Sequence, residues 1–128
     1  LDKNFEKATE IAKKYQNLFG PDFYLELQNH PSIESQQLVN KEIVKISRQL
    51  SIPIVATNDV HYLEKNDSFA QDILLMINTQ TTIHTPNRMT MTNCPDLYLK
   101  TPEEMISDFI EYPDAIKNTI EIFMEFGC

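Results

Sequence analysis

Two histidines and an aspartate follow two short apolar stretches of this 128-residue chain, and together they could bind a metal ion. Asp59 and His61 come shortly after the apolar run 53–56, and His30 follows the apolar run 23–27. Carboxylates and neutral imidazoles are common ligands of divalent metal ions. An Asp-x-His pair alone is a weak motif, whereas two histidines at equivalent positions are a stronger indication of one shared site.

Each of these residues also has a simpler interpretation. His30 could be a loop histidine that donates a hydrogen bond to a backbone carbonyl, and Asp59 could cap the turn after a strand. His61 could pack its ring beside Tyr62. The third histidine, His84, lies in a polar loop without an aligned partner, and we expect it to be solvated. The residues alone leave these alternatives open.

The segments around the candidates predict a strand–helix–strand unit. The stretches 23–27 and 54–56 are short and apolar, as in buried strands, and between them apolar residues recur at helical spacing over 33–50. Two strands joined by a helix within roughly 35 residues form a βαβ unit with parallel strands. Because parallel strands end at the same edge of a sheet, we expect the three candidate side chains to lie close together.

Helices are also predicted before and after this unit. One covers residues 1–18 and stops at Gly20-Pro21. Another begins at Asp67-Ser68, and its apolar face is formed by Phe69, Ala70, Ile73, Leu74 and Ile77. The element order predicts an α/β fold in which parallel strands are flanked by helices. So few strands form either a narrow sandwich or the trailing part of a larger fold.

The last part of the chain is predicted to be a loop followed by two helices. Residues 78–95 form a long polar loop, and 97–99 are predicted to be a short strand. The sequence Thr101-Pro102-Glu103-Glu104 is typical of a capped helix start. Pro113 begins the last helix, for which we expect three inward-facing residues and a C-terminal cap: Ile116, Ile120, Phe123 and Gly127.

The composition limits the class of protein. With 19 acidic and 11 basic residues the net charge is −8, so we do not expect the isolated chain to hold duplex DNA by its own surface. Cys94 and Cys128 are too few for a disulfide framework or a CxxC zinc site. No apolar run is long enough for a transmembrane helix, and we expect a cytoplasmic protein. The chain lacks an initiator methionine, so we expect a piece of a longer protein.

Four stretches resemble a known family. Residues 55–63 resemble the last metal-binding motif of the PHP (polymerase and histidinol phosphatase) domain, in the version found in bacterial DNA polymerase III alpha subunits. Residues 23–30 resemble the preceding metal-binding segment, and 70–75 the helix that follows. Residues 86–89 and then 98–105 resemble the segment leading towards the polymerase body. By this resemblance, 1–128 is the C-terminal portion of a single PHP domain.

The resemblance implies a partial, distorted (β/α)7 barrel with its site at the C-terminal ends of the strands. Residues 1–100 would be its strand–helix core and 101–128 the helical segment leading towards the polymerase body. His30, Asp59 and His61 would be metal ligands, and Asp59 and His61 also catalytic residues. The missing first strands and an N-terminal His-x-His motif would lie upstream. The metals implied are Zn, Mn or Mg, but three ligands do not build a multinuclear site, so we expect the isolated chain to be inactive.

The resemblance also implies a role in DNA replication. The intact protein would be a DNA-directed DNA polymerase, with metal-dependent phosphoester hydrolysis or 3′–5′ exonuclease activity at its PHP site. The alternative is an inert structural module that supports the polymerase and docks the proofreading subunit. Implied partners are DNA, the proofreading subunit and the sliding clamp, and an exposed barrel edge predicts self-association of the isolated chain. The chain departs from the family at Pro31 and at 83–85.

Overall fold

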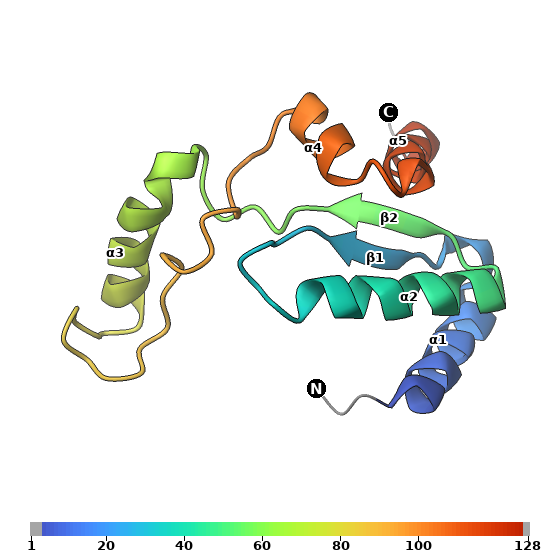
Figure 1. Ribbon diagram of the computed structural model, residues 1–128, viewed down its shortest axis with the longest axis horizontal. Coiled ribbons are helices and arrows are strands. Elements are labelled where there is room, and N and C mark those ends of the chain that lie inside the picture. Colours follow the sequence, from blue (N-terminus) through green and yellow to red (C-terminus); the bar gives the residue numbers. More distant parts are fainter. Residues whose placement is uncertain (1–3, 127–128) are drawn as a thin grey trace.

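Two parallel strands lie between helices in the computed structural model, which describes residues 4–126 (Figure 1). Strand β1 (Leu25–Gln28) pairs with strand β2 (Ile54–Thr57) in the register Leu25–Ile54 to Gln28–Thr57, and helix α2 (Gln36–Leu50) connects them. The predicted βαβ unit and the α/β class are confirmed. The first strand and the connecting helix begin slightly later than predicted.

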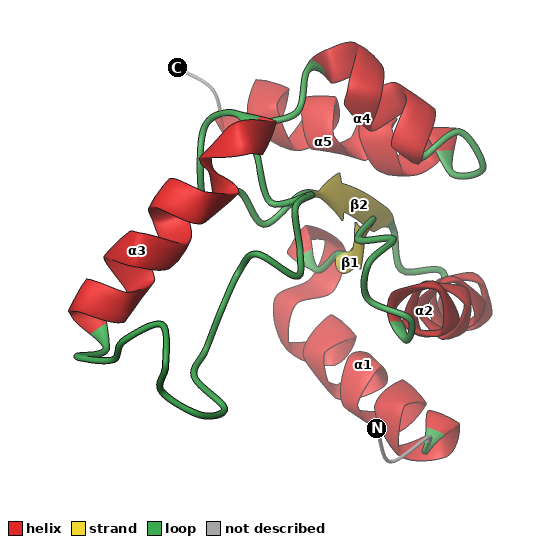
Figure 2. Ribbon diagram, turned by 60° about the vertical axis from the view of Figure 1, so that its left-hand side comes forward, coloured by secondary structure: helices red, strands yellow, loops and turns green. Residues whose placement is uncertain are grey.

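Helices α1 and α2 cover one side of the strands (Figure 2). Helix α1 (Phe5–Phe19) ends, as predicted, at Gly20, whose φ of 60° is a conformation that glycine adopts without strain. A 3₁₀ turn, η1 (Gly20–Asp22), leads into β1. Ala12, Ile46 and Ile52 form a small buried cluster on this side.

Helices α4 (Pro102–Asp108) and α5 (Pro113–Phe126) cover the other side. The main core joins the strands to α2 on one side and to the α4–α5 region on the other, and consists of Leu27, Val44, Ile54, Ala56, Phe109 and Ala115. The α4 start is confirmed: the Thr101 hydroxyl accepts from Glu104 N, and the Glu104 carboxylate accepts from Thr101 N. The predicted start of α5 at Pro113 is also confirmed, whereas Gly127 lies outside the described residues.

Helix α3 (Ser68–Asn78) extends away from the strands, as both ribbon views show. The short turn η2 (Lys65–Asp67) precedes it, and an irregular loop over 79–100 returns to the body. The apolar face predicted for α3 is largely exposed. Phe69, Leu74 and Ile77 are 60–69% exposed, and among the described elements α3 has its main contacts with the adjacent turn η2.

Two predictions for the last part of the chain are wrong. Residues 97–99 form no strand, since their only pairing is a single bridge between Tyr62 and Tyr98. Ile120 and Phe123 are exposed, because α5 turns Ala115 and the partly buried Ile116 towards the core instead. No helix within residues 4–126 is long and apolar enough to cross a membrane.

Candidate functional site

The three predicted ligands follow the C-terminal ends of the two strands. His30 lies two residues after β1, and Asp59 and His61 lie just after β2. Because the strands are parallel, both loops leave the sheet at the same edge. The structure therefore places the three residues where ligands bind in open α/β folds.

His30 is buried and has no hydrogen bond to its ring. It is only 2% exposed, and neither ring nitrogen has a partner among the described residues. The interpretation of His30 as a loop histidine bonded to a carbonyl is therefore wrong. Burial lowers the pKa of His30 and the Lys100 ammonium lowers it further, which outweighs nearby carboxylates that raise it. A neutral imidazole with a free nitrogen lone pair is the form that binds metal.

The loop after β2 orients the His61 ring. Asp59 has a φ of 50°, a left-handed conformation that aspartate tolerates, and the chain turns sharply there. The Nδ1 atom of His61 lies 2.7 Å from the Asp59 carbonyl oxygen. A carbonyl only accepts hydrogen bonds, so Nδ1 carries the hydrogen and Nε2 presents a lone pair. This arrangement is common in metal-binding histidines.

These residues do not form a complete metal site by themselves. Within residues 4–126, no three His, Cys, Asp or Glu side chains lie close enough to hold one ion. His30 fits a ligand role by its burial and free nitrogens, but further donors would have to come from elsewhere.

Asn58 fixes the segment that borders the site, a role that sequence reasoning missed. Its side chain is nearly buried, and its amide donates to Asp96 O at 3.2 Å and to Tyr98 O at 2.7 Å. The His61 backbone N–H donates to Leu97 O at 2.8 Å. The segment after β2 and residues 96–98 are thus held together by the Asn58 side chain as well as by the backbone bonds around the single bridge between Tyr62 and Tyr98.

Lys100 joins the loop of His30 to helix α4. Its ammonium lies 2.6 Å from Asp108 Oδ2 and 3.4 Å from Asn29 O, and the side chain is 5% exposed. A hollow of about 370 Å³ borders Asn29 and Asp108. No spacing rule in the sequence could have found this contact, because Lys100 and Asn29 are 71 residues apart.

Asp72 forms a second buried polar centre, on helix α3. Its carboxylate accepts two bonds from the Arg88 guanidinium, at 2.9 and 2.7 Å, and one from the Thr90 hydroxyl at 2.6 Å. These bonds hold the pKa of Asp72 well below its usual range. The sequence did contain a signal, since Asp72 is the one charged residue among 68–78.

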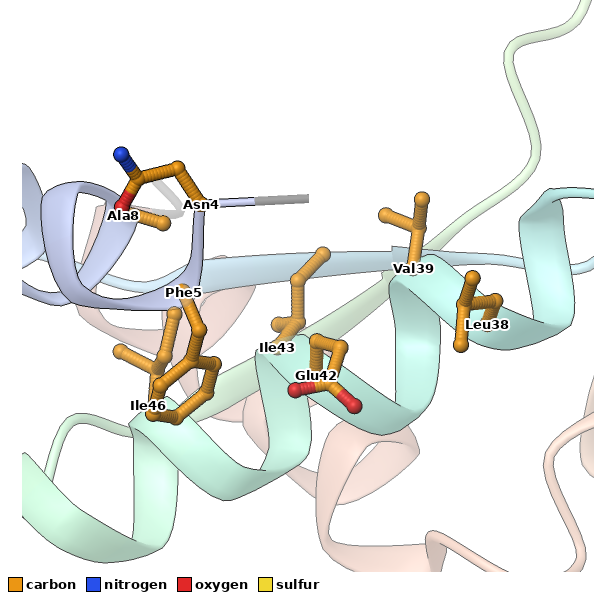
Figure 3. A pocket seen from close by; sticks show the side chains of 8 residues that line it. All are labelled: Asn4, Phe5, Ala8, Leu38, Val39, Glu42, Ile43 and Ile46. Atoms are coloured by element: carbon orange, nitrogen blue, oxygen red, sulfur yellow. The ribbon is translucent and has the colours of Figure 1, made fainter. Parts of the chain in front are cut away.

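A larger hollow lies away from these residues. It measures about 430 Å³ and lies between α1 and α2, with Phe5, Ile43 and Ile46 among its apolar walls (Figure 3). Among residues 4–126, the one carboxylate that lines this hollow belongs to Glu42, and its Oε1 atom lies 2.5 Å from Lys45 Nζ. None of the candidate ligands lines this hollow, so it is not the candidate site.

The chain is similar to curated proteins of one kind, although no family model matches it. It is 42% identical to the DNA polymerase III subunit alpha of Borreliella burgdorferi over 123 residues, 95% of this chain. It is 41% identical to that of Treponema pallidum over 117 residues, and 36% identical to that of Helicobacter pylori over 120. The chain spans only about 10% of the length of each of these relatives. It is therefore homologous, over nearly all its length, to one segment of bacterial DNA polymerase III alpha subunits.

Proposed function

We propose that this chain is the C-terminal portion of a PHP-type domain within a replicative DNA polymerase. Its similarity to alpha subunits over 95% of its length supports a place in DNA replication. The polymerase itself would work in the cytoplasm on DNA, together with the proofreading subunit and the sliding clamp. The parallel strands flanked by helices agree with a piece of an α/β barrel whose other strands lie outside 4–126.

We further propose that His30, Asp59 and His61 are ligands of a metal site used for phosphoester hydrolysis or 3′–5′ exonuclease activity. The observation that carries this proposal is His30, a buried imidazole at a strand end with neither nitrogen bonded. Leaving such a group unpaired is costly, so a partner such as a metal ion would offset the cost. A bound Zn, Mn or Mg ion would supply an activated water and charge stabilisation there.

The three side chains would differ in what they contribute. His30 would offer a ring nitrogen from a rigid, dry position, and His61 would offer Nε2, because Nδ1 is committed to the Asp59 carbonyl. Asp59 would contribute a negative charge from an exposed carboxylate, so it could also reach a substrate-bound ion. Donors outside 4–126 would complete the site.

Exonuclease activity of the intact polypeptide tests this proposal. The variant His61→Ala should lose at least about tenfold of the metal-dependent 3′–5′ cleavage of single-stranded DNA, in line with the loss of a metal ligand or its support. DNA synthesis by the same protein should stay close to wild type. His84→Ala is the matched control, since His84 is an exposed loop histidine. Cleavage that is unchanged in His61→Ala would contradict a hydrolytic site.

The second candidate function is an inert module that supports the polymerase and docks the proofreading subunit. The lack of a three-donor group within residues 4–126 favours it. In that case the intact protein would show no cleavage of its own. Its variants at His30 and His61 would instead weaken binding of the proofreading subunit or lower the stability of the polymerase.

A further inference from the structure

One short segment lies across the C-terminal ends of both strands and is bonded to the chain at each end. The Asn58 amide, directly after β2, donates to the Tyr98 carbonyl oxygen at 2.7 Å. Further along the same segment, the Lys100 ammonium lies 3.4 Å from the carbonyl oxygen of Asn29, directly after β1. Figure 1 shows the segment passing these strand ends before α4 begins. Residues 96–100 therefore connect the two loops that carry the candidate ligands.

Lys100 is a buried cation, and the stability of the fold does not explain why it is there. Its side chain is 5% exposed, and its ammonium is paired with Asp108 Oδ2 at 2.6 Å. Removing two charges from water costs about as much free energy as their attraction provides, and apolar side chains are often equally stable in such places. An apolar side chain, however, could not bind the Asn29 carbonyl. The lysine therefore makes a contact with the loop of His30 that apolar packing could not replace.

The Asn29 carbonyl belongs to the peptide unit that leads into His30. Because a peptide unit is planar, a contact that fixes its carbonyl oxygen also fixes the direction in which the chain enters the next residue. After His30, the carbonyl oxygen of His30 itself accepts a hydrogen bond from Ile33 N at 2.9 Å. The backbone is therefore held both before and after the carbon that carries the His30 ring.

The His30 ring depends on these backbone contacts for its orientation. Neither ring nitrogen has a hydrogen-bond partner among the described residues, so no bond to the ring holds it in place. The Ile33 contact is local, and the Asn40 amide bonds Gln28 O at 2.7 Å from the neighbouring helix α2. Lys100, in contrast, joins the loop to α4 on the other side of the strands.

We propose that Lys100 is a positioning residue for His30. By holding the Asn29 carbonyl close to helix α4, it keeps the His30 ring in the orientation that binds a metal ion. This role rests on the metal site proposed above and adds a residue to it. Lys100 acts through His30 and not on a substrate, because its ammonium is buried and already bonded to Asp108.

A double-mutant cycle on the metal affinity of the intact polypeptide tests this role. The metal-free protein is titrated with Zn²⁺ in competition with a coloured chelator. Lys100→Met should lower the Zn²⁺ affinity about tenfold, as expected for a residue that orients a ligand. In a His30→Ala background the same change should have little further effect, because the residue through which Lys100 acts is gone. An equal loss of affinity in both backgrounds would overturn the proposal, since Lys100 would then act on the structure in general.

Lys117→Met is the matched control for the titration. Lys117 is also paired with a carboxylate, at 3.1 Å from Glu121 Oε1, but its side chain is 75% exposed and lies on α5. This variant should bind Zn²⁺ as tightly as the wild type. A loss of affinity equal to that of Lys100→Met would contradict a specific role of Lys100.

Hydrogen exchange of the metal-free polypeptide separates this role from the metal site itself. In Lys100→Met the amide of Ile33, which bonds the His30 carbonyl, should exchange faster than in the wild type, because the loop has lost an anchor. Mass spectrometry of peptides over residues 28–33 measures this exchange. Unchanged exchange, or full Zn²⁺ affinity in Lys100→Met when His30→Ala has lost it, would overturn the role of Lys100 alone. A wild type that binds no Zn²⁺ would overturn both the metal site and this role.

Discussion

His30 and Asp72 are equally buried, at 2% exposure, but their surroundings differ in kind. The Asp72 carboxylate accepts hydrogen bonds from Arg88 and Thr90, so it needs no ligand. These bonds stabilise the fold by holding the 79–100 loop on α3. The His30 ring has no partner among the described residues. A buried polar group is normally hydrogen-bonded, so His30 is the residue whose environment most clearly asks for a ligand.

The Asp72–Arg88 pair should make stability depend on acid pH. The folded pKa of Asp72 lies below its unfolded value of about 4, so its contribution is complete above that value and declines as the pH falls towards the folded pKa. Asp72→Asn should therefore lower the free energy of unfolding at neutral pH. It should also flatten the loss of stability in acid, as measured by urea unfolding.

Asp22→Asn is the control for this experiment, because Asp22 is an exposed residue of η1. It should leave both the neutral-pH stability and its acid dependence close to wild type. If Asp72→Asn keeps the full acid dependence of the wild type, the pair does not carry that dependence.

Sequence reasoning placed the candidate residues at one edge of the sheet because topology alone decides that, but it did not predict that no three donors within 4–126 lie close enough to hold an ion. Parallel strands end at one edge, so His30, Asp59 and His61 could be placed there from their order in the chain. The residues around them could not be predicted. Lys100 meets the Asn29 carbonyl across 71 residues, and only tertiary packing brings such a pair together.

Helix α5 closes the outer edge of β2 with side chains instead of a third strand. The Asn118 amide donates to Ile54 O at 2.7 Å, and the Thr119 hydroxyl lies 3.3 Å from Ala56 O. Pro53 O accepts from Leu25 N, so the carbonyls of Ile54 and Ala56 point to the edge that faces away from β1. The Thr119 hydroxyl also lies 3.1 Å from Ala115 O, so its single hydrogen is shared between two carbonyls. The bond from Asn118 to the β2 edge is therefore the stronger of the two.

Removing this cap should destabilise the chain. Asn118→Ala should lower the free energy of unfolding by about 1–3 kcal/mol, because the Ile54 carbonyl would be left without its partner. Asn17→Ala on α1 is the control, since it makes the same change of helix propensity at an exposed position. Urea unfolding of both variants gives the comparison, and equal effects would mean that the bond to Ile54 adds nothing.

Local signals predicted element ends better than element faces. The start of α4 was predictable because Thr101, Pro102 and Glu104 determine it within four residues. The faces of α3 and α5 were not predictable, because apolar spacing shows that a helix has an apolar side but not what covers it. Ile77 and Phe123 are examples: both lie on the apolar side of their helix, and both are exposed.

The whole molecule consists of a packed α/β body with one outlying helix. The body holds the strand ends with His30, Asp59 and His61, and α3 presents apolar residues on its own support. Both features are incomplete within residues 4–126. The site has no three donors close enough to hold one metal ion, and the apolar residues of α3 are not covered by another part of the described chain. The relatives, of which this chain spans about a tenth, place such a segment inside a much longer polypeptide.

The metal content of the intact polypeptide that carries this segment tests the central claim most directly. After dialysis against metal-free buffer, elemental analysis should find bound Zn or Mn in the wild type and clearly less in His30→Ala. His84→Ala should match the wild type, because His84 is exposed and lies outside the candidate site. Equal metal content in wild type and His30→Ala would contradict the account, since His30 would then be no ligand.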